Sequence, residues 1–188
     1  MNTERVIEFL AGITDLSDKF KLALEANLKP EIYKAHQILH AAGHMENRVY
    51  FLDSGFARNY YYDHHGNEHT VRFWQSGDIL FSYEGYYKVS SYFYTEILEE
   101  TRMTTLSYAN VHELDETFPE MQVLIKTMLL KYQREEYQKQ QLIALPAQER
   151  FQLLKKTQPS LFQKAPARII ASYLHLTRET VTRYIGKH

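Results

Sequence analysis

The sequence predicts an α+β fold in which helical segments flank a central antiparallel β sandwich or barrel. Apolar residues recur at helical spacing near the N-terminus and again after Phe118. Between about Lys34 and Ser107, short segments rich in Val, Ile, Tyr, Phe and Thr alternate with Gly, Asn and Asp. Several short strands at such close spacing are typical of antiparallel sandwiches and barrels.

The composition narrows the classes of function. With 188 residues, 44% of them hydrophobic, the chain can bury one core of ordinary size, or one domain with a small appendage. The absence of cysteine excludes disulfides, thiolate metal sites and cysteine nucleophiles. No apolar run approaches the roughly 20 residues of a membrane span, and the first residues lack a signal-peptide pattern. We therefore expect a cytoplasmic protein with no membrane partner.

The expected elements begin with one or two short helices, because Leu16, Phe20, Leu24 and Leu28 follow helical spacing ahead of Pro30. Strands follow, separated by turn signals at Ser54-Gly55 and at Asp63 to Asn67. The expected strands are Val49 to Leu52, Phe56 to Tyr62 and His69 to Trp74.

A long helix is predicted from about Phe118 to Ile143. Its apolar residues step by four, three and four positions, as in the seam of a coiled coil. The seam consists of Met121, Ile125, Met128 and Tyr132. One interpretation is a helix packed on its own barrel; the favoured one is a dimer helix, because the polar Glu135 and Lys139 interrupt the stripe.

Charge divides the chain near Pro146. Residues 1–145 hold 14 Lys and Arg against 21 Asp and Glu, whereas residues 146–188 hold 8 against 2. A polyanion would bind the basic tail. Since Pro146 also ends the long helix and suits the start of another, we expect three parts: an N-terminal domain over 1–117, a long helix and hinge over 118–145, and a basic C-terminal domain over 146–188.

The tail carries the pattern of a helix-turn-helix from Ile169 to Ile185. Thr177 can cap the second helix by accepting the backbone N–H of Thr180, and the small Ala171 suits a helix crossing. The residues expected to close one apolar cluster are Ile170, Leu176, Val181 and Ile185. The remaining face holds Arg178, Glu179, Thr182 and Arg183, and arginine and glutamate can recognise guanine and cytosine in a major groove. A plain helical hairpin with a solvated charged face is the alternative.

The residue types favour DNA recognition. From Thr177 to Arg183 the sequence resembles the recognition helix of the CRP/FNR family of bacterial regulators, in which Arg-Glu-Thr-Val-x-Arg follows a Ser or Thr cap. The resemblance implies base contacts by Arg178, Glu179 and Arg183. Expected contacts to the DNA backbone come from Thr177, Thr180, Thr182 and, at the end of the chain, Lys187. The sequence departs from the pattern at His175, a turn position that is usually glycine because it tends to need positive φ.

The resemblance covers almost the whole chain. It implies N-terminal helices, a jelly-roll sensor domain like those that bind cyclic nucleotides, a long dimerisation helix and a C-terminal helix-turn-helix. The expected protein is a homodimer that presents two recognition helices to successive major grooves of a roughly palindromic double-stranded DNA site. No cofactor is expected.

Relatives that bind cyclic nucleotides hold the phosphate with a Gly-Glu-Leu segment and an Arg-Ser or Arg-Thr pair. Here the segment starts at Gly77-Asp78-Ile79-Leu80, and Ser91 stands where the arginine would be; the nearest cations are Lys88 and Arg102. Binding of a cyclic phosphate is therefore not expected.

Aromatic rings are frequent in this segment, and we expect them to fill the barrel interior. They are Phe81, Tyr83, Tyr86, Tyr87, Tyr92, Phe93 and Tyr94. Alternatively, the segment forms a pocket for a flat or apolar effector. Its residues would be Tyr83, Glu84, Ser90, Ser91, Tyr92 and Tyr94.

A histidine cluster at His64, His65 and His69, next to Asp63 and Glu68, raises a metal-dependent cupin-like enzyme as an alternative. Adjacent histidines on a strand point opposite ways and Gly66-Asn67 marks a hairpin, so a solvated turn without metal is favoured. No glycine-rich phosphate loop, Gly-x-Ser-x-Gly or His-Glu-x-x-His motif occurs, and no enzymatic activity is predicted. A sensor or scaffold that has lost DNA binding is the third hypothesis.

Overall fold

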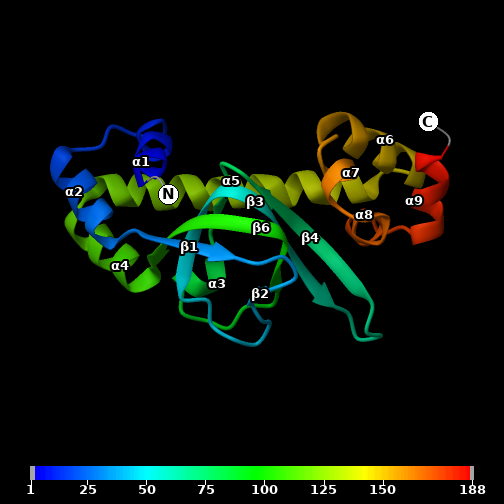
Figure 1. Ribbon diagram of the computed structural model, residues 1–188, viewed down its shortest axis with the longest axis horizontal. Helices are drawn as coiled ribbons and strands as arrows, with labels where there is room; N and C mark the ends of the chain where they lie inside the picture. Colours follow the sequence, from blue (N-terminus) through cyan, green and yellow to red (C-terminus); the bar gives the residue numbers. More distant parts are fainter. Residues whose placement is uncertain (1–2, 187–188) are drawn as a thin grey trace.

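The computed structural model describes residues 3–186 and has the predicted α+β order. Figure 1 shows one long helix running the length of the molecule, with the sheet beneath its middle. The helices are α1 (Thr3–Ala11), α2 (Asp18–Asn27), α3 (Tyr83–Tyr86), α4 (Tyr108–Thr117), α5 (Pro119–Ala144), α6 (Ala147–Thr157), α7 (Leu161–Lys164), α8 (Ala167–Leu174) and α9 (Arg178–Ile185). The strands are β1 (Lys29–Tyr33), β2 (Ile38–His40), β3 (Arg48–Tyr62), β4 (Glu68–Gln75), β5 (Ile79–Leu80) and β6 (Tyr94–Ser107).

The sheet is antiparallel, with the order β1-β6-β3-β4; β2 pairs with β6 and β5 with β3. Its centre is the pair of long strands β3 and β6. Residues alternate along β4 between buried and half-buried positions, because successive side chains of a strand point to opposite faces.

Gly55 corrects one sequence expectation. Ser54-Gly55 is not a turn between two strands but an irregularity inside the continuous strand β3, where the register against β6 shifts. Gly55 has φ +119°, and a Cβ there would lie 2.6 Å from the Cα of Thr101. Only glycine allows β3 to approach β6 so closely at this point.

We expect Gly55→Ala to destabilise the protein by about 1–3 kcal/mol, the usual cost of a forced backbone conformation. Urea unfolding measures this loss. Gly43→Ala is the matched control: Gly43 also has positive φ, +84°, but has no atom within 4 Å of an added Cβ. Equal losses for the two variants would contradict a role for the contact with Thr101.

Three apolar clusters hold the molecule together. The first joins α1, α2, α4 and the first half of α5 to the sheet through residues such as Phe20 and Leu124. The second consists of side chains from the strands β3, β4, β5 and β6, with Leu52 and Ile97 at its centre. The third is formed by α6 to α9, and it includes Phe56 of β3. The C-terminal helical segment (α6–α9) therefore shares its core with the sheet.

The break between α5 and α6 falls at Leu145 and Pro146, where the hinge was predicted. The division into parts at 117 and 145 stays a prediction, because α6–α9 pack on the sheet as well as on one another.

Candidate nucleic-acid interface

The two helices α8 and α9 form the predicted helix-turn-helix. Thr177 caps α9: its Oγ1 accepts the backbone N–H of Thr180 at 3.2 Å. His175 ends α8 in the left-handed conformation, with φ 52° and ψ 49°. The turn therefore has the positive φ that relatives obtain with glycine, and a histidine adopts it here.

The packing of α9 on α8 follows the expected cluster in part. Val181 is fully buried against Ile170 and Ala171, and Leu176 packs against the same group. Ile185 was expected in this cluster, but its side chain is 44% exposed. Tyr184 takes the inward position instead, with its ring 5.3 Å from that of Phe151 on α6.

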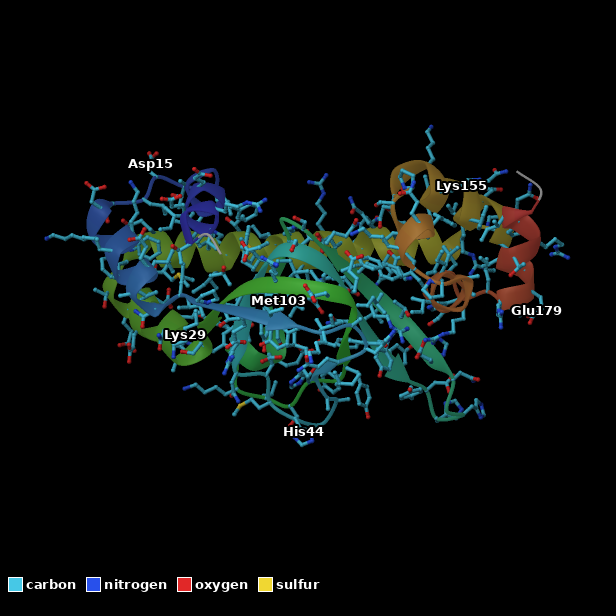
Figure 2. All side chains as sticks on the ribbon, viewed as in Figure 1. Asp15, Lys29, His44, Met103, Lys155 and Glu179 are labelled. Carbon is cyan, nitrogen blue, oxygen red and sulfur yellow. The ribbon has the colours of Figure 1, made fainter. Side chains whose placement is uncertain are left out.

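The predicted base-reading residues lie together on the outer face of α9. Arg178, Glu179 and Arg183 are exposed, and Figure 2 shows Glu179 at the end of the molecule farthest from Asp15. Thr182 is exposed beside them, whereas Thr180 is half-buried and its hydroxyl lies 3.0 Å from that of Thr177. Lys187 lies outside the described residues. The arrangement leaves one polar helix face open to a groove, with its N-terminus capped by a threonine.

Arg150 makes structural contacts that the sequence did not predict, and they hold α6 to the ends of α5 and α8. Its Nε donates to the carbonyl oxygen of Leu145 at 2.8 Å, and its Nη1 to that of Leu174 at 2.7 Å. One side chain on α6 thus satisfies carbonyl groups at the ends of α5 and α8. An arginine in the first turn of a helix gave no signal of this contact.

The start of β4 holds α8 against the sheet. The backbone N–H of Thr70 donates to Ser172 Oγ at 2.6 Å, and Ser172 Oγ donates to the carbonyl oxygen of Glu68 at 2.9 Å. Glu68 also pairs with the buried Arg58 at 2.6 Å. Burial alone would raise the pKa of Glu68, but the hydrogen bonds from Arg58 hold it below its usual value. Helix α8 is therefore fixed to the sheet by satisfied polar contacts.

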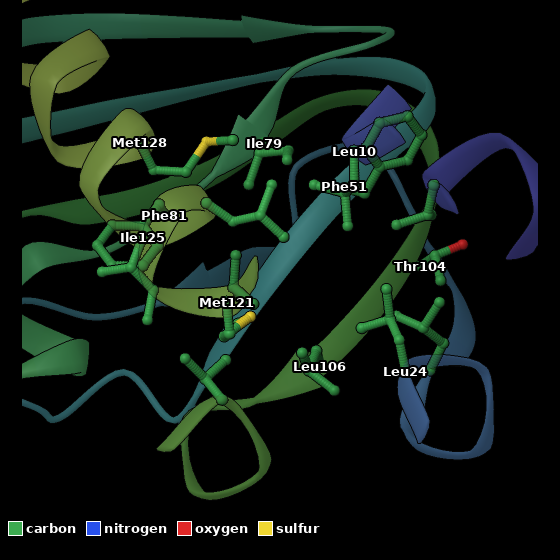
Figure 3. A pocket seen from close by; sticks show the side chains of 15 residues that line it. Leu10, Leu24, Phe51, Ile79, Phe81, Thr104, Leu106, Met121, Ile125 and Met128 are labelled. Atoms are coloured by element: carbon green, nitrogen blue, oxygen red, sulfur yellow. The ribbon is translucent and has the colours of Figure 1, made fainter. Parts of the chain in front are cut away.

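The structure corrects the predicted dimer seam on α5. Met121, Ile125 and Met128 are buried, and they pack against the chain's own helices and sheet. Figure 3 shows these three side chains facing an apolar cavity of about 70 Å³, across from Leu10, Leu24 and Phe51. Tyr132, the fourth seam residue, is half-buried under the guanidinium of Arg72, whose Cζ lies 3.8 Å from the ring centroid. The heptad-like stripe is thus an intrachain packing face.

A second stripe runs along the opposite side of α5. Val123, Leu130 and Tyr137 are spaced by seven residues, and they are 45%, 57% and 60% exposed. Residues seven apart lie on the same side of a helix. The sequence interpretation overlooked this stripe because polar residues, Thr127 and Arg134, occupy the positions between its members.

Comparison with solved structures agrees with this arrangement. FixK2 from Bradyrhizobium japonicum superposes with a TM-score of 0.74 and 20% identity, over 85% of this chain and 83% of that one. A CRP/FNR-family transcriptional regulator from Thermus thermophilus gives 0.66 and 19%, over 85% and 84%. CLP, the c-di-GMP responsive global regulator of Xanthomonas campestris, gives 0.68 and 15%, over 91% of each chain. No protein-family model and no curated protein matches the sequence.

The chain has the fold of the CRP/FNR regulators. In this fold the N-terminal helices, the antiparallel sheet of a cyclic-nucleotide-binding-like domain, the long helix and the C-terminal helices follow in the predicted order. Among residues 3–186, no helix is both long enough and apolar enough to span a membrane.

The segment after Gly77, which corresponds to the phosphate-binding segment in the sequence comparison, differs from the sequence-based expectation in two respects. It contains the short helix α3, capped by Ser82, which the sequence did not reveal. Of its seven aromatic rings only Phe81 is buried; Tyr83, Tyr87 and Tyr92 are exposed, Tyr92 by 74%. The expectation that the rings fill the interior was wrong: Tyr83 and Tyr87 lie on and directly after the short helix α3 with their rings in solvent, and Tyr92 lies in the loop before β6.

The expected effector pocket is divided. Glu84 and Ser91 are buried and line one small interior pocket, together with His40, Glu46 and Tyr132. Tyr92 and Tyr94 line a separate hollow at the surface. Tyr83 and Ser90 are exposed and line neither hollow.

The interior pocket is acidic. In the described part of the chain no lysine or arginine lines it, whereas Glu46 and Glu84 do. Burial raises the pKa of Glu46, and the hydroxyl of Tyr50 donates to its Oε1 at 3.0 Å. A buried phosphate would find no lysine or arginine there, and His40, the remaining basic side chain, already lies 3.4 Å from Glu46 Oε2.

The histidines of the β3–β4 hairpin lie in a turn, as expected, with Gly66 at φ +80°. His64 and His65 do not point opposite ways: their ring centroids are 3.8 Å apart, because they leave the strand before the turn. Asp63 Oδ2 lies 2.9 Å from His69 Nε2, and hydrogen bonds from His69 and Asn67 hold the pKa of Asp63 below its usual value. Within the described ranges, no group of three or more His, Asp or Glu side chains is placed to hold a metal ion.

Proposed function

We propose that this chain is a sequence-specific DNA-binding transcription regulator. The observation that carries the proposal is the capped recognition helix α9, whose open face presents Arg178, Glu179 and Arg183. Arginine recognises guanine through two hydrogen bonds and glutamate accepts one from cytosine, so this face suits a major groove. The similarity in fold to known transcription regulators supports the same function.

Selection of bound DNA from a random pool with the full chain tests this function. We expect enrichment of a palindrome with half-sites about one helical turn apart, and binding that weakens steeply as salt is raised. Failure to enrich any sequence at low salt would contradict the proposal and favour a sensor or scaffold that has lost DNA binding. The cupin-like alternative lacks a candidate metal site in residues 3–186.

The regulator is proposed to act as a homodimer through the exposed stripe of α5, Val123, Leu130 and Tyr137. Apolar side chains spaced by seven residues and left in solvent favour pairing with the same stripe of a second copy. Two-fold symmetry would then place two copies of α9 on one face of the assembly.

The effector of this regulator is not expected to be a cyclic nucleotide bound in the usual way. We expect 1 mM cyclic AMP to shift the melting temperature by less than about 1 °C, since only tight binding to the folded state raises it appreciably. Differential scanning fluorimetry measures the shift. An increase of several degrees that Ser91→Ala abolishes would contradict this prediction.

A further inference from the structure

A cleft of about 680 Å³ lies where the sheet, the long helix and the C-terminal helical segment meet. Its walls are β4, the second half of α5, α6 and Tyr173 of α8. Ligand pockets commonly have volumes of about 300–1,000 Å³ and occur at the junctions of structural units. A molecule bound in this cleft would contact β4, α5, α6 and α8. The relative positions of these elements determine the orientation of α9.

Arg72 forms the buried polar floor on the β4 side. Its side chain is only 9% exposed, and it pairs through Nε with Glu135 at 3.5 Å and through Nη2 with Glu136 at 3.0 Å. Its Nη1 is buried without a hydrogen-bond partner among the described residues. Buried donors are nearly always satisfied in folded proteins, so an unpaired guanidinium nitrogen beside a cleft points to a missing acceptor.

Lys139 lies about one helical turn beyond Glu136 on the same wall. Its ammonium group donates to the carbonyl oxygen of Tyr173 and lies 3.0 Å from the centroid of that ring. No carboxylate of residues 3–186 lies within 4 Å of it, and burial lowers the pKa of Lys139 to about 6. A buried amine held in this way favours an arriving anion, which would restore its charge.

The acidic groups of the cleft are already paired and lie nearer to solvent. Glu135 and Glu136 contact Arg72, and Asp78 contacts Lys131 at 3.4 Å. The side chains of these three acids are 34%, 42% and 32% exposed, which screens their charges. The cleft thus has two basic side chains, Arg72 and Lys139, at its floor, and the carboxylates that pair with Arg72 lie nearer to solvent.

The α6 side of the cleft is an apolar leucine wall, in which Leu154 is buried and Leu153 is partly exposed. Leu142 on α5, one turn after Lys139, and Trp74 on β4, beside Arg72, add further apolar surface. The lining therefore offers basic side chains on β4 and α5 facing apolar surface on α6. A molecule that carries both an acidic group and an apolar body would be complementary to this lining.

We propose that this cleft binds an organic carboxylate with an apolar body, whose negative group meets Lys139 and Arg72 and whose body packs on the leucine wall. A carboxylate fits better than an uncharged molecule because Arg72 Nη1 has no acceptor among the described residues and the buried amine of Lys139 would regain its charge beside an anion. The ligand would hold α6 and α8 at a fixed angle to β4 and α5. Its effect on DNA binding rests on the proposed function; its binding does not.

The test uses the full chain and a pair of probes with the same body, naphthalene-2-carboxylate and the uncharged naphthalene-2-carboxamide. Calorimetry is expected to show the carboxylate binding at least 10-fold more tightly than the amide. Lys139→Met should remove this preference and keep a melting temperature at least as high as the parent, because it replaces a buried amine with an apolar group of similar length.

Lys155→Met is the matched control, since Lys155 lies on α6, exposed and outside the cleft lining. It should bind the carboxylate as the parent does, and Leu153→Trp, which fills the cleft, should weaken both probes. Equal affinity for the two probes, an unchanged affinity in Lys139→Met, or no binding of naphthyl and alkyl carboxylates at millimolar concentration would each overturn the proposal.

A second measurement separates this proposal from the proposed function. With the DNA selected from the random pool, saturating naphthalene-2-carboxylate should change the DNA affinity severalfold, and the DNA should change the carboxylate affinity by the same factor. Carboxylate binding in a protein that binds no DNA would overturn the proposed function alone.

Discussion

Arg178→Ala is expected to lower the affinity for the selected palindrome by at least about 30-fold. One bidentate contact to guanine discriminates by ~1–3 kcal/mol, and a dimer would lose two of them. Because Arg178 is exposed, the variant should fold as the parent does. Fluorescence anisotropy with the selected site and with its single-base variants measures the loss and shows at which base pair the preference disappears.

Two further variants make this result specific. Arg102→Ala removes an exposed arginine from β6 and should leave DNA binding unchanged. Lys187→Ala should weaken binding to all sequences about equally, as expected of a contact to phosphate. A loss in Arg178→Ala that is the same for every sequence would contradict its role in reading bases.

Leu130→Glu is expected to convert the proposed dimer into a folded monomer and to weaken binding to the palindrome by more than about 100-fold. A glutamate at the middle of the exposed stripe would place two like charges in an apolar interface, which is costly to desolvate. A monomer also loses the gain in affinity that comes from linking two half-sites. Sedimentation equilibrium gives the association state, and anisotropy gives the affinity.

The other positions of α5 provide the controls. Gln122→Glu adds the same charge at an exposed position away from the stripe and should stay dimeric. Met128→Glu places the charge in the intrachain core and should unfold the protein, whereas a folded monomer would restore the original seam on Met121, Ile125 and Met128. If Leu130→Glu sediments as a dimer, pairing through this stripe is wrong.

The helix-turn-helix could be predicted from the sequence because its signals are local. The Thr177 cap, the helical spacing that buries Val181 and the turn at His175 all involve residues a few positions apart. The same holds for the break at Pro146 and for the order of the elements. Such signals do not depend on how distant segments pack.

Which stripe of α5 is buried within the chain could not be identified in this way. Both stripes of α5 repeat at intervals that suit a helical interface, and only the position of the sheet and of α2 determines which one is covered. The sequence interpretation chose the more apolar stripe, and the more apolar stripe belongs to the interior. The cleft at Lys139 was likewise invisible, because it arises from segments far apart in the chain.

The position of Phe56 determines whether the C-terminal helices can be exchanged between proteins of this fold. This side chain belongs to β3, yet it packs in the core of α6–α9 and stacks on Phe73, whose ring in turn lies 5.0 Å from that of Tyr173. If C-terminal helices from another protein were grafted after Pro146, their side chains would have to pack against Phe56 and Phe73, whose surface is complementary to the native helices. Grafts of this kind should succeed only when the surface of β3 and β4 is transplanted with them, so the boundary that matters for recombination lies within the sheet and not at the hinge.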